Sequence, residues 1–315
     1  MLPLILSKFL ITIFLSFIFI IIEYSKFYSI YKIRIYIFIF YFISLLILYI
    51  CLMAKNENKY IKEFIDYYKN LGINKIILYD NNDIKDDNLK VILKKYINNN
   101  FIELINYRGL FKPQKKAYDD CYNNNKYKYN WFVFYDADEF LYLVNHSTIN
   151  NFLSLKRFSN CSNILINWKY YGDNGNIYYK PKLMKERFPK PYIFSQKDKK
   201  NKYLYMAAKT IVRGGLNITW EHFPHYLKNQ IFCRPDGSKT KSYFSEPQYS
   251  YAYIKHYTTK STQEYIEKVL RGGGVTKINS TRYLKHRINH YYFLINKKTK
   301  KKIQLFEKAL KFKIH

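Results

Sequence analysis

Two carboxylates that flank one small residue follow directly after an apolar run of the sequence. Asp136 and Asp138 lie on either side of Ala137, after the residues WFVFY at 131–135, which read as a buried strand. Such a pair leaves the end of a strand within reach of a single ion, and Mg²⁺ or Mn²⁺ takes one or two carboxylates together with phosphate oxygens and water. We therefore expect Mn²⁺ or Mg²⁺ at Asp136 and Asp138, where it would neutralise a diphosphate leaving group.

Polar clusters also follow two other apolar runs. Residues 55–57 (KNE) come after the apolar residues 48–53, and residues 80–82 (DNN) come after KIILY at 75–79. Apolar residues recur at helical spacing between 60 and 71, between 89 and 97 and between 113 and 123.

Short, continuous apolar strands that alternate with helices predict an α/β fold, a mostly parallel sheet with helices on both faces. Ligands bind at the carboxyl ends of the strands in open sheets of this kind. Residues 55–57, 80–82 and 136–139 should therefore converge on one crevice.

Several short blocks of the sequence occur in the order found in one group of enzymes. AKNE at 54–57 and LYDNN at 78–82 resemble the opening of family-2-like glycosyltransferases with a GT-A (Rossmann-like) fold, and the whole set is most similar to the group related to glycosyltransferase family 92. The resemblance covers residues 48–273. The later blocks are Gln114 with Ala117, Tyr118 and Cys121, WFVFYDADEFL at 131–141, WKYYGDNG at 168–175, ERF at 186–188, KTIVR at 209–213 and KHYTTKS at 255–261.

The resemblance implies a nucleotide-sugar donor, usually a divalent metal, and sugar transfer to a glycan, lipid or protein acceptor. Asp136 and Asp138 match the metal-binding positions, and His256 is implied as a third ligand or a phosphate contact. The other positions implied in donor binding are Lys55, Asn56 and Glu57 for the nucleotide pocket, Asp80 and Asn82 for the base or ribose, and Gln114 for the donor pocket.

The residue types do not settle which group would deprotonate the acceptor hydroxyl. Asp173 lies in a loop bounded by Gly172 and Gly175 that suits close approach of a substrate, although a turn-forming aspartate is the simpler interpretation. Glu139 is a second candidate, either as the base or as a cap of the next segment, and Glu221 and His225 are further ones.

Ser261 is followed three residues later by Glu264, the spacing of a capping box. We therefore interpret Ser261 as the cap of the helix that follows and not as a nucleophile.

Two apolar runs open the chain. Residues 2–22 have close to the length of about 20 residues that a bilayer-spanning helix needs, and residues 35–54 contain no charge. We favour a single N-terminal signal anchor over a two-helix hairpin. The predicted division is a membrane anchor at 1–46, a catalytic domain at 47–273 and a basic helical extension at 274–315. We expect the protein at a membrane, in the Golgi or the endoplasmic reticulum if the source is eukaryotic.

The net charge of +30 is unevenly distributed. Residues 151–315 have 34 basic and 9 acidic side chains, whereas residues 51–150 have 15 and 13. The surplus therefore lies in the half expected to face the acceptor, the diphosphate and lipid headgroups. No Arg-rich or recognised nucleic-acid-binding motif occurs, so we expect no nucleic acid partner. The basic run 297–302 and the amphipathic stretch after it suit either a helix on an anionic membrane surface or a solvated terminal helix.

Two other function classes remain open. One is a different metal-dependent, phosphoryl-handling enzyme such as a nucleotidyltransferase, which needs more carboxylates near Asp136 than the acid-poor C-terminal half offers. The other is a non-enzymatic binder of polyanions or membrane surfaces. An aromatic content of 20% excludes a disordered chain.

The four cysteines are spaced too irregularly for a zinc motif and too sparsely for a disulfide framework. We expect mostly buried thiols, with one disulfide allowed for in an oxidising lumen. The cysteines are Cys51, Cys121, Cys161 and Cys233.

Overall fold

The computed structural model describes residues 47–310, apart from residues 87, 224, 229, 242–243, 273–280 and 296–298. The first run predicted to span a membrane, 2–22, lies outside this range, as does the second up to residue 46. The end of the second run forms strand β1 (Leu48–Ala54), as its alternative interpretation required. In the described part of the chain, no helix combines the length and the apolar character that a membrane crossing needs.

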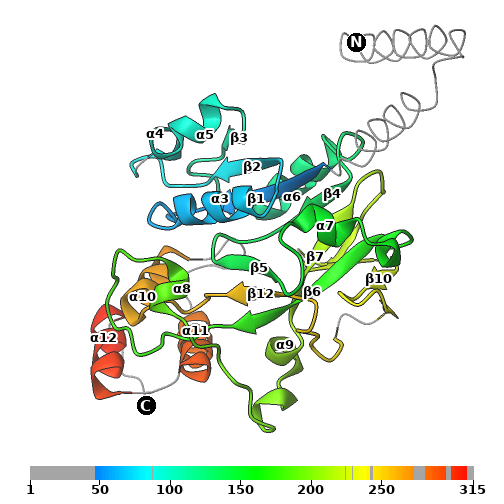
Figure 1. The fold of residues 1–315 in the computed structure, drawn as a ribbon. Helices are drawn as coiled ribbons and strands as arrows, with labels where there is room; N and C mark the ends of the chain where they lie inside the picture. Colours follow the sequence, from blue (N-terminus) through cyan, green and yellow to red (C-terminus); the bar gives the residue numbers. More distant parts are fainter. Residues whose placement is uncertain are drawn as a thin grey trace, which may run out of the picture. The chain divides into compact units, whose positions relative to one another are not determined.

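Ten strands form one sheet within the described residues, and Figure 1 shows their arrangement. The main path runs in the order β11-β10-β6-β7-β4-β1-β2-β3, and β12 joins it by pairing with β5 and β6. The bounds are β2 Lys75–Asp80, β3 Ile102–Asn106, β4 Trp131–Val133, β5 Glu139–Leu143, β6 Asn163–Tyr170, β7 Ala208–Arg213, β10 Phe232–Cys233, β11 Lys239–Thr240 and β12 Ala252–His256, with β8 Trp220–His222 and β9 Tyr226–Leu227 as a separate pair.

Helices cover both faces of the parallel part of the sheet. Alternate side chains of β1 point to opposite sides and therefore pack against helices on opposite faces. Leu48, Ile50 and Leu52 belong to the same core as the buried face of α3 (Ile61–Asn70). Tyr49 and Cys51 pack instead with α6 (Gln114–Asn123). The predicted arrangement of helices on both faces is confirmed here. The shorter helices are α4 Leu89–Ile92, α5 Lys94–Asn98, α7 Ile149–Leu153, α8 Met184–Arg187 and α9 Lys202–Tyr205.

The sheet as a whole is mixed, which corrects the prediction of a mostly parallel one. β3, β2, β1 and β4 pair in parallel, but β7 runs antiparallel to both β4 and β6. The strict alternation of strand and helix that predicted parallel pairing ends after residue 133. Beyond it, strands follow one another through loops and short helices, and such connections allow antiparallel neighbours.

Strand β12 joins distant parts of the chain. It pairs antiparallel with β5 and parallel with β6, and Figure 1 shows it beside both strands. The register sets His256 opposite Glu139 and opposite Tyr170. His256, which lies more than 100 residues further along the sequence, is thereby brought next to the acidic loop 136–139.

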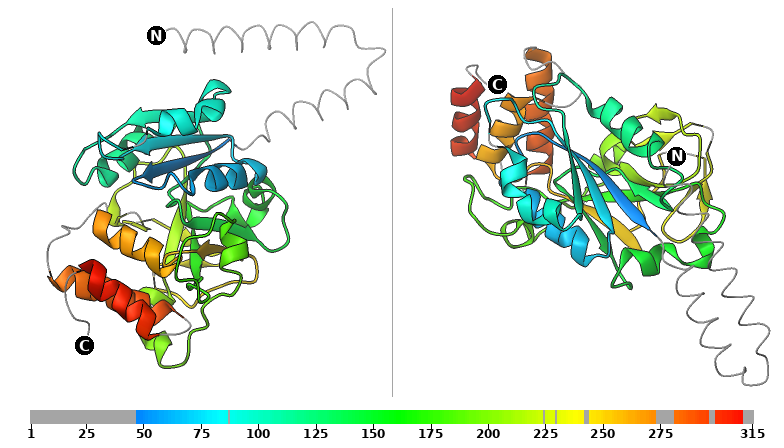
Figure 2. Two further views of the ribbon diagram at one scale, coloured as in Figure 1. Left: turned by 90° about the vertical axis from the view of Figure 1, so that its left-hand side faces the viewer. Right: turned by 90° about the horizontal axis from the view of Figure 1, so that it is seen from above.

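Three helices near the C-terminus form a second, smaller core. α10 (Thr262–Arg271), α11 (Thr281–Leu294) and α12 (Lys300–Leu310) lie side by side, and both views of Figure 2 show them together. Tyr265, Tyr291 and Phe306 are fully buried between them. Phe306 of α12 is therefore covered by protein. Phe312, which belongs to the same amphipathic stretch, lies outside the described residues, so a membrane-facing role of this stretch stays a prediction.

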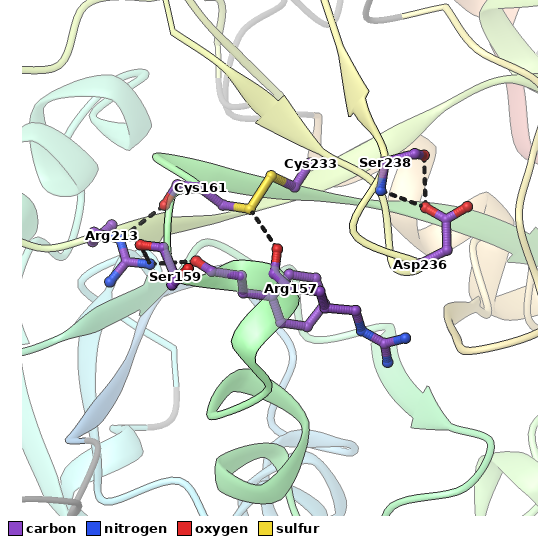
Figure 3. The surroundings of a disulfide bond; sticks show 8 residues. Arg157, Ser159, Cys161, Arg213, Cys233, Asp236 and Ser238 are labelled. Carbon is purple, nitrogen blue, oxygen red and sulfur yellow. Dashed lines mark hydrogen bonds between the residues drawn. A yellow bond between two sulfur atoms is a disulfide. The ribbon is translucent and has the colours of Figure 1, made fainter.

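All four cysteines are bonded in pairs, which corrects the expectation of mostly free thiols. Cys51 of β1 is bonded to Cys121 of α6, with a Cα–Cα distance of 6.1 Å. Cys161 is bonded to Cys233 of β10, with a Cα–Cα distance of 5.8 Å, and Figure 3 shows this bond. The partners are 70 and 72 residues apart in the sequence, so local spacing gave no sign of them.

Hydrogen bonds surround the disulfide between Cys161 and Cys233. The guanidinium of Arg213 donates to the carbonyl oxygens of Phe158, Ser159 and Cys161, and so closes the turn that leads into β6 (Figure 3).

Candidate functional site

The three polar clusters that follow β1, β2 and β4 meet at the carboxyl edge of the sheet, as predicted. The backbone N–H of Asn56 donates to Oδ1 of Asn82 over 2.7 Å, which joins the ends of β1 and β2. Lys260 reaches from the loop before α10 to Oε2 of Glu57 (3.2 Å) and to Oδ2 of Asp138 (3.9 Å). One cationic side chain thus links the first and third clusters.

Asp136 is the more exposed of the two paired carboxylates. Its side chain is 39% exposed, and Oδ2 accepts a hydrogen bond from the buried ammonium of Lys209 over 3.0 Å. Lys209 also lies 3.5 Å from Oε2 of Glu139, a carboxylate with no exposed surface. Burial opposes the charge on Lys209, but the Asp136 and Glu139 carboxylates outweigh it and raise the pKa of this lysine.

Glu139 lies beneath the acidic loop. Its Oε2 accepts from the backbone N–H of Asp136 over 3.1 Å, which fixes the turn that carries the pair. Burial raises the pKa of Glu139 well above its usual value despite the attraction of Lys209. This position agrees with the cap that the sequence allowed for.

Asp138 is buried among cations. The ammonium of Lys268 lies 2.6 Å from its Oδ2, and Nε2 of His256 lies 3.6 Å from its Oδ1. Burial alone would raise the pKa of Asp138, but Lys268 and Lys260 hold it well below its usual range. Asp138 is therefore ionised at neutral pH.

Glu57 orients two of the basic side chains at this edge. It pairs with Lys260 and with the guanidinium of Arg271. Arg271 also donates to the backbone carbonyl of Asn56 over 3.0 Å, which ties the end of α10 to the end of β1. Lys260 lies 4.1 Å from the ring centroid of Tyr60, a cation–π distance.

A pocket of about 540 Å³ opens beside these residues. Its walls come from the loop after β1 and the start of α3, the loop after β2, and α10. Of the residues predicted to bind the donor, Asn56 lines it directly, whereas Glu57 and Asn82 hold lining residues from behind. The lining residues are Asn56, Asn58, Lys59, Tyr60, Lys85, Asp86, Lys260, Glu264, Glu267, Lys268 and Arg271.

The acidic pair fits a divalent cation by its donor set. Lys209 and Lys268 each engage the Oδ2 atom of one carboxylate, and Nε2 of His256 lies 3.6 Å from Oδ1 of Asp138. A cation at this pair would take carboxylate oxygens that these side chains now contact. Oδ1 of Asp136 has only a weak contact, 3.4 Å from the amide nitrogen of Gln114. No group of three or more acidic, His or Cys side chains forms a ready-made metal cage in the described residues. Two carboxylates completed by phosphate oxygens are nevertheless a usual Mg²⁺ arrangement.

His256 stands beside this pair, where the resemblance implied it. Burial lowers the pKa of His256, so its ring is neutral at physiological pH, and neutral imidazole is the form that binds a cation.

Asp80 and Asn82 brace loops and do not line the pocket. Arg108 donates to Oδ2 of Asp80 over 3.2 Å and to the carbonyl oxygens of residues 83, 84 and 86. Asn82 binds Asn56 and Asn58. Lys55 pairs with Asp83 over 3.1 Å. These residues shape the loops that form the pocket walls.

Asp173, the first of the candidate bases, has contacts with Lys302, Gly175 and Tyr291 and none with the acidic pair among the described interactions. It is fully buried, its Oδ2 lies 2.5 Å from the ammonium of Lys302, and its Oδ1 accepts from the backbone of Gly175. These contacts are those of a structural aspartate in a turn. Among the other candidates, His225 faces the carbonyl of Ala208 over 2.9 Å, and Glu221 is exposed on β8.

Sequence reasoning missed the partner of Asp136. Lys209 lies in the strand AKTIVR at 208–213, beside the apolar residues Ala208, Ile211 and Val212, and is completely buried. A single lysine on the buried side of such a strand requires a carboxylate partner. That signal was present in the sequence, although nothing in it identified which carboxylate.

The curated proteins to which this chain is similar include members of glycosyltransferase family 92. A glycosyltransferase family 92 protein of Arabidopsis thaliana is 29% identical over 97 residues, which are 31% of this chain and 16% of the relative. One of Oryza sativa subsp. japonica is 25% identical over 104 residues, 33% of this chain and 18% of the relative. These alignments thus span about a sixth of the length of the curated relatives.

Among solved structures, S. aureus TarS 1–349 has a TM-score of 0.38 at 13% identity, over 84% of this chain and 71% of that chain. TarS 1–349 in complex with UDP-GlcNAc has a TM-score of 0.34 at 16% identity, over 53% and 45%. The profile of glycosyltransferase family 92 matches residues 48–309, from β1 into α12. Since this match spans most of the sequence, the chain belongs to glycosyltransferase family 92.

Proposed function

We propose that this protein transfers a sugar from a nucleotide-sugar donor to a glycan, lipid or protein acceptor, with Mn²⁺ or Mg²⁺ held at Asp136 and Asp138. The observation that carries the proposal is the pocket whose α10 wall presents Lys260, Lys268 and Arg271 next to Asp138. Family membership supports the same class of reaction.

The pocket has the size and chemistry for the donor. Its volume of about 540 Å³ lies within the range of small-molecule sites, roughly 300–1,000 Å³. The three basic side chains on the α10 wall provide positive charge for a diphosphate, while the amides of Asn56 and Asn58 offer hydrogen bonds to ribose or base. This division places the diphosphate towards Asp138 and the nucleoside towards the loop after β1.

Several residues of the chain would contribute to the transfer reaction, each in a different way. A divalent cation at Asp136 and Asp138 would stabilise the negative charge of the departing nucleoside diphosphate. Glu57 holds Lys260 and Arg271 against the same phosphates. Glu139 and Lys209 fix the acidic loop from below.

The arrangement in the cell is part of the proposal. We place the donor-binding residues on a GT-A scaffold, preceded by an N-terminal membrane anchor within residues 1–46. Two observations support this arrangement: the strand order around β1, β2 and β4, and the apolar sequence before residue 47.

The test is binding and turnover with a panel of nucleotide sugars in the presence of Mn²⁺. We expect at least one donor to bind and to be hydrolysed slowly without acceptor, and Asp136→Asn and Asp138→Asn each to lower turnover by about 100-fold or more. Asp66→Asn is the matched control, because Asp66 is exposed on α3 and accepts from Tyr96 away from the pocket. The proposal fails if no donor binds and the two variants behave like the control.

A further inference from the structure

Lys268 connects the acidic pair with the pocket. Its ammonium lies 2.6 Å from Oδ2 of Asp138 and 3.3 Å from the carbonyl oxygen of Thr258. Its side chain is 21% exposed and forms part of the α10 wall. One side chain therefore faces both the carboxylate expected to bind a cation and the space expected to hold a diphosphate.

The two neighbouring cations are held differently. Lys260 and Arg271 both pair with Glu57, which is not one of the expected metal ligands. Lys260 is fixed further by the ring of Tyr60 and is only 4% exposed. Lys260 also lies 3.9 Å from Oδ2 of Asp138, but the ammonium of Lys268 lies only 2.6 Å from it. Lys268 therefore makes the closer of these two contacts with Asp138, and this is the contact that a bound divalent cation would replace.

Charge balance follows from these contacts. In the ligand-free protein, Lys268 neutralises Asp138, a buried carboxylate that would be costly to leave without a counter-charge. A divalent cation at Asp138 would repel the ammonium and release it towards the pocket. A diphosphate in the pocket would then supply the negative charge that Lys268 has lost.

We propose that Lys268 is an exchangeable counter-ion: it occupies Asp138 before the cation binds, competes with the cation for this carboxylate, and turns to the donor diphosphate once the cation is in place. The inference rests on the proposed function, since it assumes the metal and donor sites described above. It makes cation binding weak without a nucleotide and couples the binding of the two.

The first experiment measures Mn²⁺ binding alone, by calorimetry on the purified full chain. Lys268→Met removes the competitor and the repelling charge, so it should bind Mn²⁺ about tenfold more tightly than the wild type. The same variant should bind a nucleoside diphosphate in the presence of Mn²⁺ about tenfold more weakly. Lys59→Met is the control, because Lys59 lines the same pocket but pairs with Glu267. It should leave Mn²⁺ affinity unchanged.

A second pair of variants tests the proposal even if Lys268→Met by itself does not fold. Asp138→Asn frees Lys268 without removing it, so a nucleoside diphosphate should bind this variant more tightly than the wild type when no metal is present. Adding Lys268→Met to Asp138→Asn should abolish that gain.

The outcomes separate the two proposals. If the wild type binds Mn²⁺ and Asp138→Asn does not, but Lys268→Met binds it no more tightly than the wild type, the counter-ion role is wrong and the metal site stands. The counter-ion role is equally wrong if the gain of Asp138→Asn persists in the double variant. If Mn²⁺ binding is absent from the wild type, the metal site of the proposed function is itself wrong, and the counter-ion role falls with it.

Discussion

The ammonium of Lys302 lies 2.5 Å from Oδ2 of Asp173, and both side chains are buried. Tyr291 of α11 donates to the same oxygen over 2.9 Å, and its hydroxyl also contacts Oγ1 of Thr262 over 2.7 Å. Thr262 is the first residue of α10, the helix that carries Lys268 and Arg271. Helix α12 is thus tied through a buried polar chain to the helix that forms one wall of the pocket.

Removing the ammonium of Lys302 from this buried polar network should destabilise the fold. Lys302→Met leaves the buried carboxylate of Asp173 without its cationic partner, a change that costs about 3–5 kcal/mol in comparable cases. We expect this loss in urea unfolding. Lys300→Met, on the exposed side of the same helix, should unfold like the wild type. Adding Asp173→Asn to Lys302→Met should restore part of the loss, and equal midpoints for Lys302→Met and Lys300→Met would show that the pair contributes nothing.

The two disulfides predict that the stability of the protein depends strongly on reductant. Each closes a loop of about 70 residues, and removing such a bond typically costs about 2–5 kcal/mol. The double variant Cys161→Ser with Cys233→Ser, and separately Cys51→Ala with Cys121→Ala, should lower the urea midpoint. Reductant should lower the wild type further than either variant. Alkylation of the native protein followed by mass spectrometry should find no free thiol, and labelling of all four cysteines would refute the pairing.

Because His225 is buried, we expect the free energy of unfolding to fall as the pH is lowered. Burial, together with the nearby charge of Lys209, lowers the pKa of His225 to about 4. The unfolded chain therefore takes up a proton near the ordinary histidine value of about 6.5, while the folded chain does not. The stability that depends on neutral His225 is complete above pH 6.5 and is lost as the pH falls from there towards 4.

His225→Gln should flatten the pH dependence within this window. Unfolding free energies measured from pH 8 to pH 4 should differ in slope between variant and wild type only below pH 6.5, and the range above it serves as the internal control. Parallel curves over the whole range would contradict the assignment.

Ser261 should behave as a helix cap. Its hydroxyl accepts from the backbone N–H of Glu264, and Glu264 accepts from the backbone N–H of Ser261 over 3.1 Å, the two bonds of a capping box. Ser261→Ala should cost about 1 kcal/mol of stability. Turnover measured well below the melting temperature should stay within a few-fold of the wild type, whereas a nucleophile would lose nearly all of it. Ser261→Thr, which keeps the capping hydroxyl and its hydrogen bond to Glu264, should lose less stability than Ser261→Ala.

The local sequence pattern was sufficient to predict the elements that depend only on residues close together in the sequence. The helix between 60 and 71, the strand at 75–79 and the capping box at Ser261 were expected within a residue or so of where they lie. The continuous helix expected between 89 and 97 is instead two short ones that meet at Leu93, whose backbone leaves the helical region there. Apolar spacing does not report such a break.

Contacts between distant residues account for what was missed. Lys209 meets Asp136 across 73 residues, and Lys302 is still further from Asp173 along the chain. Nothing within the segment of either lysine identifies its carboxylate, and only the pairing of β7 with β4 and the packing of α12 bring the partners together. The convergence of the strand ends could be foreseen because parallel topology dictates it. The counter-charges come from β7, from α10 with the loop before it and from α12, whose positions local pattern does not reveal.

The position of β12 has a consequence for how the protein is made. The strand pairs with both β5 and β6, and it and the helix after it carry His256, Lys268 and Arg271 into the site. Pairing over such sequence distances forms slowly, because the intervening chain must be ordered first. A growing polypeptide that has reached β7 holds its acidic pair without the cations that neutralise Asp138. The proposed donor site therefore becomes complete only after residue 271 has been synthesised, so the proposed activity should appear late in maturation and fragments ending before β12 should be inert.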